Sequence, residues 1–215
     1  MIQLPETTYY GKRMPKEKFY SHLEVSATVK RSFIDDVDFF VWLNKLSAST
    51  LNVKAGDKVK EMALFEVHLK REEYNPTLFE FIDRNVPVYV VYLLRFEGNV
   101  QLLASYKEPS GNKSGTFRVV ESFASDWMPE NDIDLFVDGL NLDSIYENFI
   151  RQIAGSKLKS ASSENLVVDI EAEQRRAKIE RQIAQLESKR RKEKQFNRQM
   201  ELSAEIKKLN EQEKG

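Results

Sequence analysis

Hydrophobic and polar positions change period several times within the first 155 residues, as they do in globular proteins that mix helices with strands. Residues 62–70 alternate between apolar and polar side chains, which predicts a strand. The runs 88–96, 100–107 and 116–123 are rich in β-branched and aromatic residues and are separated by turn-forming segments, which predicts antiparallel neighbours. Residues 32–46 instead place apolar side chains at helical spacing and predict a helix.

Two more helices are predicted in this part of the chain. Residues 78–82 have helical spacing, and residues 142–153 form a strongly apolar helical segment that Gly155 ends. Because such a helix needs an apolar sheet face to cover, we predict an α+β fold with a largely antiparallel sheet packed with helices. Residues 1–155 would form this globular head, with residues 1–29 as an extended N-terminal arm punctuated by Pro and Gly.

The composition changes after residue 165. Residues 166–214 contain neither Gly nor Pro and predict a long charged helix, while the small and polar residues 156–165 predict a linker. Apolar residues in the predicted helix form two sets with coiled-coil spacing, and the two sets are out of phase with each other. Their members are Ile179, Ile183, Leu186, Leu202, Ile206 and Leu209. Because a single helix cannot bury such an edge, we expect these residues to bind a protein partner or a second copy of the chain.

The charge and the residue types exclude several classes of site. The net charge is −1, and the absence of cysteine excludes disulfides and thiolate chemistry. Two histidines are too few for a histidine-based metal site, so we expect neither a metal nor another cofactor. No stretch has the length and apolar composition of a membrane span, so we expect no membrane association and a cytoplasmic location.

One candidate catalytic set lies on the predicted strand at 62–70 and on an acid, Glu61, that could approach it. Glu61, Glu66 and Lys70 are the residue types with which a metal-dependent nuclease holds Mg²⁺ and stabilises the charge that develops on a phosphoryl group. Restriction-type nucleases place the acid and the lysine two residues apart, whereas Glu66 and Lys70 are four apart. The spacing therefore favours a solvent-facing row of polar residues over a catalytic site.

One dense basic stretch lies in the predicted C-terminal helix. It consists of Lys189, Arg190, Arg191, Lys192, Lys194 and Arg198. Such a stretch can neutralise nucleic-acid phosphates. Glu187, Glu193 and Glu201 lie close to it in the sequence and weaken the local positive field, so a solvated helix surface with weak nucleic-acid binding at most is favoured.

Several short motifs give the chain a resemblance to a known family. They are Leu4-Pro5, Gly11-Lys12, Pro15 to Tyr20, Phe33 to Val37, Trp42 to Ser47, Thr50 to Val53, Glu61 to Val67, Ile82-Asp83-Arg84 with Pro87, Ala104 with Tyr106-Lys107, and Lys192 to Arg198. The chain resembles the bacterial family called domain of unknown function 4391, to which no activity is assigned. The resemblance implies proteins encoded beside helicases and methyltransferases of restriction-like defence systems.

These observations together favour a protein that works through partners. We expect a non-catalytic accessory or adaptor subunit of a bacterial DNA-processing or anti-phage defence complex, bound through its C-terminal helix. Its partner would be a protein such as a helicase or methyltransferase of that system. The alternatives are a divergent Mg²⁺-dependent nuclease and a nucleic-acid-binding module that acts through the basic stretch.

Overall fold

The computed structural model describes residues 2–111, 115–158 and 165–214. The chain divides into two compact units, Met1–Gly155 and Ser156–Gly215, which we call the head and the tail. Most of the predicted linker at 156–165, namely residues 159–164, lies outside the described residues.

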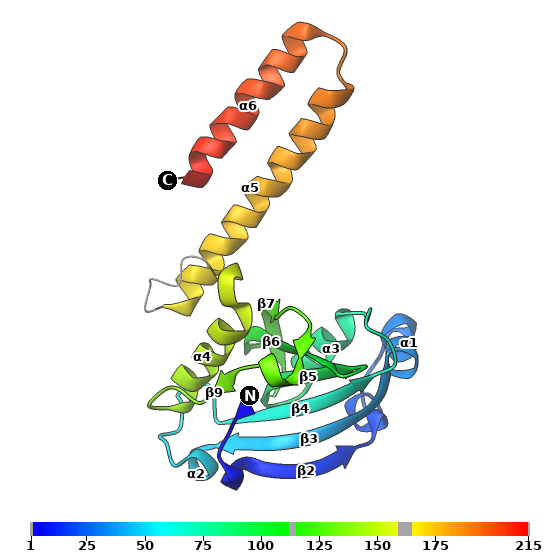
Figure 1. The fold of residues 1–215 in the computed structure, drawn as a ribbon, viewed down its shortest axis with the longest axis vertical. Coiled ribbons are helices and arrows are strands. Elements are labelled where there is room, and N and C mark those ends of the chain that lie inside the picture. The colour runs from blue at the N-terminus through cyan, green and yellow to red at the C-terminus, as the bar shows by residue number, and fades with distance from the viewer. Residues whose placement is uncertain (1, 112–114, 159–164, 215) are drawn as a thin grey trace. The chain divides into compact units, whose positions relative to one another are not determined.

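The head is α+β and is built on one large sheet (Figure 1). Its strands are β1 (Ile2–Gln3), β2 (Tyr9–Met14), β3 (Val37–Ser47), β4 (Glu61–Leu69), β5 (Tyr89–Phe96), β6 (Asn99–Pro109), β7 (Phe117–Ala124), β8 (Met128–Pro129) and β9 (Leu135–Phe136). Its helices are α1 (Ala27–Asp35), α2 (Ala48–Leu51), α3 (Thr77–Asn85) and α4 (Leu142–Ala154). Short 3-10 helices occupy Glu6–Thr8, Lys16–Phe19 and Glu130–Asp132.

The sheet has the strand order β2-β3-β4-β5-β6-β7, and β8 pairs with β6. All of these neighbours are antiparallel except β4 and β5, which are parallel and joined through α3. A separate parallel pair joins β1 to β9. The largely antiparallel sheet is therefore confirmed, as are the strands predicted at 62–70, 88–96, 100–107 and 116–123.

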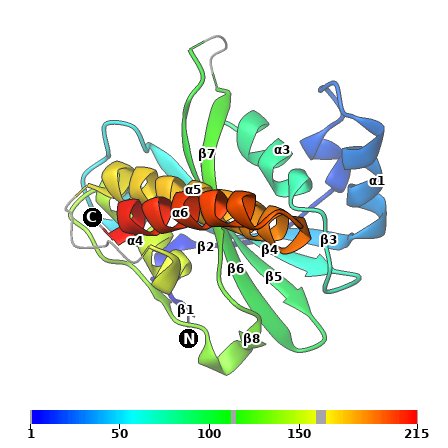
Figure 2. The ribbon, with the colours of Figure 1, turned by 90° about the horizontal axis from the view of Figure 1, so that it is seen from above.

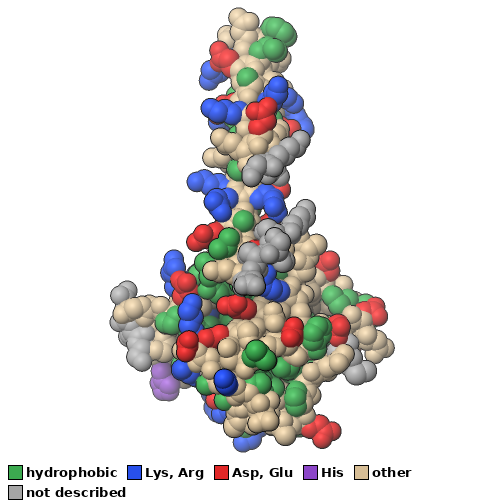
Figure 3. All heavy atoms as spheres, turned by 90° about the vertical axis from the view of Figure 1, so that its left-hand side faces the viewer, with side chains coloured by type: hydrophobic (Ala, Val, Ile, Leu, Met, Phe, Trp, Pro, Cys, Tyr) green, Lys and Arg blue, Asp and Glu red, His purple; other side chains and the backbone are tan. Residues whose placement is uncertain are grey.

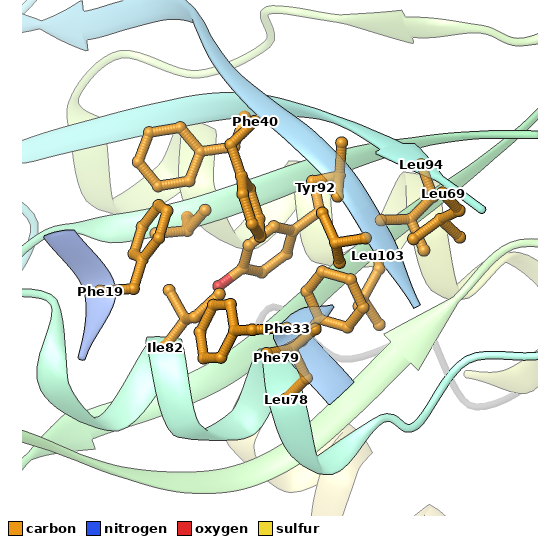
Figure 4. Packing of buried hydrophobic residues seen from close by; sticks show 14 of the residues in the cluster. Phe19, Phe33, Phe40, Leu69, Leu78, Phe79, Ile82, Tyr92, Leu94 and Leu103 are labelled. Atoms are coloured by element: carbon orange, nitrogen blue, oxygen red, sulfur yellow. The ribbon is translucent and has the colours of Figure 1, made fainter. Parts of the chain in front are cut away.

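Helices cover both faces of the sheet, and we name each face by its helix. On the α3 face, α1 and α3 cover a cluster of buried aromatic and aliphatic side chains in which the rings of Phe79 and Tyr92 lie 4.9 Å apart (Figure 4). On the α4 face, the ring of Tyr146 lies 4.7 Å from that of Tyr89. Tyr89 and Tyr92 belong to the same strand, where side chains alternate between faces, so each strand supplies both layers.

The predicted helix at 32–46 is wrong. Residues Ala27–Asp35 form α1, with the Ser26 side chain capping its first turn, and Val37–Ser47 form strand β3. Apolar residues at 33, 37, 40 and 41 satisfy helical spacing, but residue 33 belongs to α1 and the apolar run 39–43 suits a strand with apolar side chains on both faces. The β-branched and aromatic residues of this segment, which fit a pleated surface, agree with the strand.

The tail is a helical hairpin and not one continuous helix. Helix α5 (Leu166–Lys192) ends at Lys192, helix α6 (Phe196–Lys214) begins after a connection of three residues, and the two helices pack side by side (Figures 1 and 2). The connection contains neither Gly nor Pro. Glu193 begins it in an extended conformation, and its carboxylate accepts hydrogen bonds from the backbone N–H groups of Lys194 and Gln195 at 2.7 and 3.0 Å.

Candidate functional site

The structure does not bring Glu61, Glu66 and Lys70 together. Glu61 and Glu66 lie five positions apart on β4, which separates them by about 16 Å and places their side chains on opposite faces. Glu61 pairs with Lys45 at 2.9 Å, and Lys70 donates a hydrogen bond of 2.8 Å to the carbonyl of Ile34. Among the described residues, no three His, Asp or Glu side chains are placed to share a metal ion. The nuclease hypothesis therefore has no assembled site in these three residues.

Lys70 instead belongs to a structural cluster at the end of α1. Its ammonium group and that of Lys16 donate to backbone carbonyls there, Lys16 to those of Phe33 and Val37 at 3.0 and 2.7 Å. Cations at a helix C-terminus satisfy its unpaired carbonyls and interact favourably with the helix dipole. Partial burial is the largest cause that lowers the pKa of Lys16. These two lysines therefore serve the fold of the head.

Glu66 lies in a polar strip that crosses the α4 face. Its carboxylate receives a hydrogen bond from Nε2 of His68 at 2.7 Å and one from Nε of Arg95 at 2.8 Å. Arg95 extends from β5, and its second nitrogen pairs with Glu130 at 2.7 Å. The hydrogen bond to Glu130, followed by that to Glu66, raises the pKa of Arg95, and Arg95 lowers the pKa of Glu130 in return. The strip is thus a chain of paired charges.

Aromatic side chains extend this strip toward the sheet edge. The ring of His68 stacks on Phe39 of β3 with centroids 4.0 Å apart, and the Arg13 guanidinium of β2 lies 4.2 Å from the Phe39 centroid. A cation over a ring face and a stacked imidazole hold one another in place by electrostatic and dispersion attraction. Arg13, Phe39, His68 and Glu66 therefore form a continuous row across three neighbouring strands.

An open hollow of about 330 Å³ lies beside Arg95. Its lining residues are Ile2, Leu4, Tyr9, Leu43, Asn44, Leu93, Arg95, Glu130, Asn131 and Ile133. The apolar floor and few polar groups are typical of small ligand sites, and the volume lies at the small end of their range. Both charged groups of the hollow already pair with each other, so a charged ligand would have to break an existing ion pair.

A second group of perturbed residues is wholly buried in the head. Asp83 of α3 and Lys107 of β6 form an ion pair of 3.2 Å with fully buried side chains. Lys107 also donates to the carbonyls of Asp83 and Val88 at 2.9 and 2.8 Å, and Ser105 donates to the Asp83 carboxylate at 2.7 Å. Burial is the largest cause that raises the pKa of Asp83 and lowers that of Lys107.

This buried pair lacks the features of a reactive site. The three N–H bonds of the Lys107 ammonium have three acceptors, so the group is fully hydrogen-bonded. The same contacts tie the end of α3 to strand β6 and to Val88, the residue just before β5. Perturbed pKa values occur in structural ion pairs as well as in catalytic sites. The geometry of this pair fits the structural role, because neither charged group reaches solvent.

The six apolar residues predicted to bind a partner lie in the tail hairpin. Leu202 and Ile206 are buried, and the other four are half-buried. Arg190 of α5 donates to the Ser203 hydroxyl of α6, which marks one level of the antiparallel pair. With equal rise in both helices, Leu186 then lies within one residue of the level of Ile206, about one turn further from the connection. The second helix that the apolar edge needs is therefore supplied by the same chain.

The hairpin also explains why the two apolar sets are out of phase. Ile179, Ile183 and Leu186 belong to α5, whereas Leu202, Ile206 and Leu209 belong to α6. A connection of three non-helical residues between them resets the helical phase, so each set follows the period of its own helix. The hairpin buries Leu202 and Ile206 and leaves the other four residues half-buried, so self-association through this edge stays a prediction.

The basic stretch surrounds the connection between α5 and α6. Arg191 lies 3.8 Å from Glu187, and Arg198 pairs with Glu201 at 2.6 Å. Lys189, Lys192 and Lys194 have no acidic partner among the described residues. Two large apolar side chains, Phe196 and Met200, are 72% and 57% exposed on the first turns of α6. Figure 3 shows hydrophobic and basic side chains together near this end of the hairpin.

Comparison with known proteins identifies the family. A family described as Domain of unknown function (DUF4391) matches residues 2–212, so the chain belongs to it. No curated protein and no solved structure matches the chain. Within the described part of the chain, no helix is both long and apolar enough to cross a bilayer.

Proposed function

We propose that the protein is a non-catalytic adaptor subunit of a bacterial DNA-processing or anti-phage defence complex, and that the tail hairpin carries its partner contact. The observation that carries the proposal is the hairpin itself. It is a compact unit separate from the head, it buries part of its own apolar edge, and it presents exposed apolar and basic side chains at its connection. An αα-hairpin of this kind offers a preformed helical surface for a partner.

The dispersal of the candidate catalytic residues supports an adaptor over a nuclease. Glu61, Glu66 and Lys70 each have another partner in the head, and the perturbed pair Asp83 and Lys107 is sealed from solvent. The polar strip on the α4 face is saturated by its own ion pairs. Partner identity, a helicase or methyltransferase encoded with this protein, follows from the family resemblance and is part of the proposal.

Affinity purification from the native host tests the adaptor function. The full chain is compared with a chain that ends at residue 158, and urea denaturation checks that the head of the shortened chain stays folded. We expect a helicase or methyltransferase to copurify with the full chain and to be lost with the hairpin. Recovery of the same partner by the shortened chain would contradict the role of the hairpin.

A nuclease assay tests the competing function on the purified full chain. We expect no Mg²⁺-dependent cleavage of DNA. Cleavage that persists in Arg118→Met, a control that removes an exposed ion pair with Glu108 outside this set, and disappears in Glu66→Ala would overturn the adaptor proposal in favour of an enzyme.

A further inference from the structure

The residues around the hairpin connection, 187–201, which we call the hairpin tip, carry an excess of positive charge. This segment contains six lysines and arginines and three glutamates. The carboxylate of Glu193 is occupied by the backbone N–H groups of Lys194 and Gln195, which lower its pKa. Three of the lysines have no acidic partner within the described residues. The tip is therefore a concentrated basic surface on a protein whose overall net charge is −1.

Helix electrostatics account for only part of this charge. Cations in the last turn of α5, such as Lys189 and Lys192, interact favourably with the negative end of its dipole. Lys194 lies just before α6 and Arg198 in its first turn, near the end of the helix where the dipole is positive and disfavours cations. Fold stability therefore does not explain why basic residues occupy both sides of the connection, whereas binding of an anionic partner does.

The tip also presents an aromatic surface among these cations. Phe196 and Met200 are four residues apart, so they share one face of α6, and both side chains are largely exposed. An open groove of about 320 Å³ runs between the helices nearby and is bordered by Lys189, Lys192, Glu193, Arg198 and Leu202. Cations that bind phosphates beside an exposed ring that stacks on bases are the combination that binds single-stranded nucleic acid.

We propose that the hairpin tip binds single-stranded nucleic acid, with Lys189, Lys192 and Lys194 on the phosphates and Phe196 stacked on an unpaired base. Duplex ends and grooves offer phosphates but no unstacked base, so the exposed ring favours the single strand. The proposal goes beyond the adaptor function, because it gives the protein a nucleic-acid ligand of its own. It needs no partner protein, and its test uses the purified full chain alone.

Fluorescence anisotropy with a labelled 20-nucleotide thymidine oligomer measures this binding across a series of salt concentrations. The variant Lys189→Gln/Lys192→Gln/Lys194→Gln keeps good helix formers and loses three cations. We expect weaker binding and a log–log salt slope that is smaller by about 2, since each phosphate contact contributes about 0.7 on single strands. Phe196→Ala should weaken binding by about tenfold and leave the salt slope unchanged, because stacking is not ionic.

The matched control is Arg175→Gln/Lys178→Gln/Arg181→Gln, which removes three cations from α5 far from the connection. It should bind like the wild type, and circular dichroism should show equal helicity in all variants. Equal weakening by the control would overturn the proposal, as would no binding at 50 mM salt. Tighter binding of a 20-base-pair duplex would also overturn it. So would displacement of the oligomer by polyglutamate as effectively as by unlabelled oligomer, because that result would indicate a surface that binds acidic proteins in general.

Discussion

Lys107→Met removes one partner of the buried ion pair and tests what holds the centre of the head together. The methionine side chain is similar in length but cannot donate a hydrogen bond. Its introduction leaves the Asp83 carboxylate without its cation and the Val88 carbonyl without its donor, in a region with no access to solvent. Asp83 keeps one hydrogen bond, from Ser105.

The expected loss follows from the cost of an unpaired buried charge. Removal of one partner of a buried ion pair typically lowers the free energy of unfolding by about 3–5 kcal/mol. In a protein of this size each kcal/mol lowers the melting temperature by about 2–4 °C, so the melting temperature should fall by roughly 10 °C. That loss is large compared with the total stability of an ordinary domain.

The pH dependence of the loss has a definite sign. Burial already raises the pKa of Asp83, and attraction to Lys107 opposes the rise, so the variant should raise it further. A carboxyl group with a raised folded-state pKa binds its proton more tightly when folded, and this stabilisation is lost as the pH rises through that pKa. The stability deficit of Lys107→Met should therefore be smaller near pH 4 than at pH 7.

Urea denaturation followed by tryptophan fluorescence measures the loss, because both tryptophans, Trp42 and Trp127, lie in the head. Lys45→Met makes the same substitution in a partly exposed ion pair and should cost less than about 1 kcal/mol. The double variant Asp83→Asn/Lys107→Met should lose less than the sum of the two single variants. Additive losses, or a loss no larger than that of Lys45→Met, would refute the reasoning.

Three further predictions concern other parts of the chain. Lys16→Met should lower the free energy of unfolding by about 1–2 kcal/mol in urea denaturation, because two carbonyls at the end of α1 lose a charged donor. Glu130→Gln should flatten the fall in stability below pH 4.5, because Arg95 lowers the pKa of Glu130 and the pair stabilises the fold only while the carboxylate stays ionised. Leu202→Ala should destabilise the hairpin by about 2 kcal/mol, which circular dichroism would show as a loss of helix while tryptophan fluorescence stays unchanged. Met200→Ala changes an exposed side chain and should leave the helical signal unchanged.

Local pattern was sufficient for the sheet between residues 88 and 124. Its strands are β-rich runs separated by turn residues, and consecutive strands pair with each other, so no long-range information is needed. The segment 37–47 shows where local pattern fails. Strand β3 carries apolar side chains on both of its faces, so it lacks the alternation that marks a strand and matches a helical period by coincidence.

The polar strip required information that the local pattern lacks. Glu66 and His68 are two positions apart on one strand, so their proximity follows from sequence. Arg95 joins them through the parallel register of β4 and β5, in which Glu66 lies opposite Leu93 and His68 opposite Arg95. Glu130 comes from a short helix after the sheet and has no periodic signal at all. Only the tertiary fold shows that these residues form one chain of charges.

The tail shows a signal that was present in the sequence and pointed to a different structure. Two coiled-coil sets out of phase cannot face one partner helix along a straight rod, because each would point in its own direction. A hairpin resolves this conflict, since each set then faces the other across the pair, with Leu202 and Ile206 buried and the other four residues half-buried. The turn between them uses Glu193, whose carboxylate satisfies two N–H groups that the start of α6 leaves without helical partners. The chain therefore leaves α5 without Gly or Pro. Burial of Leu202 and Ile206 favours the turn, and the Glu193 carboxylate satisfies backbone N–H groups within it. Because the same turn brings the basic residues of both helices to one place, the packing that stabilises the hairpin also creates the surface that we assign to nucleic acid.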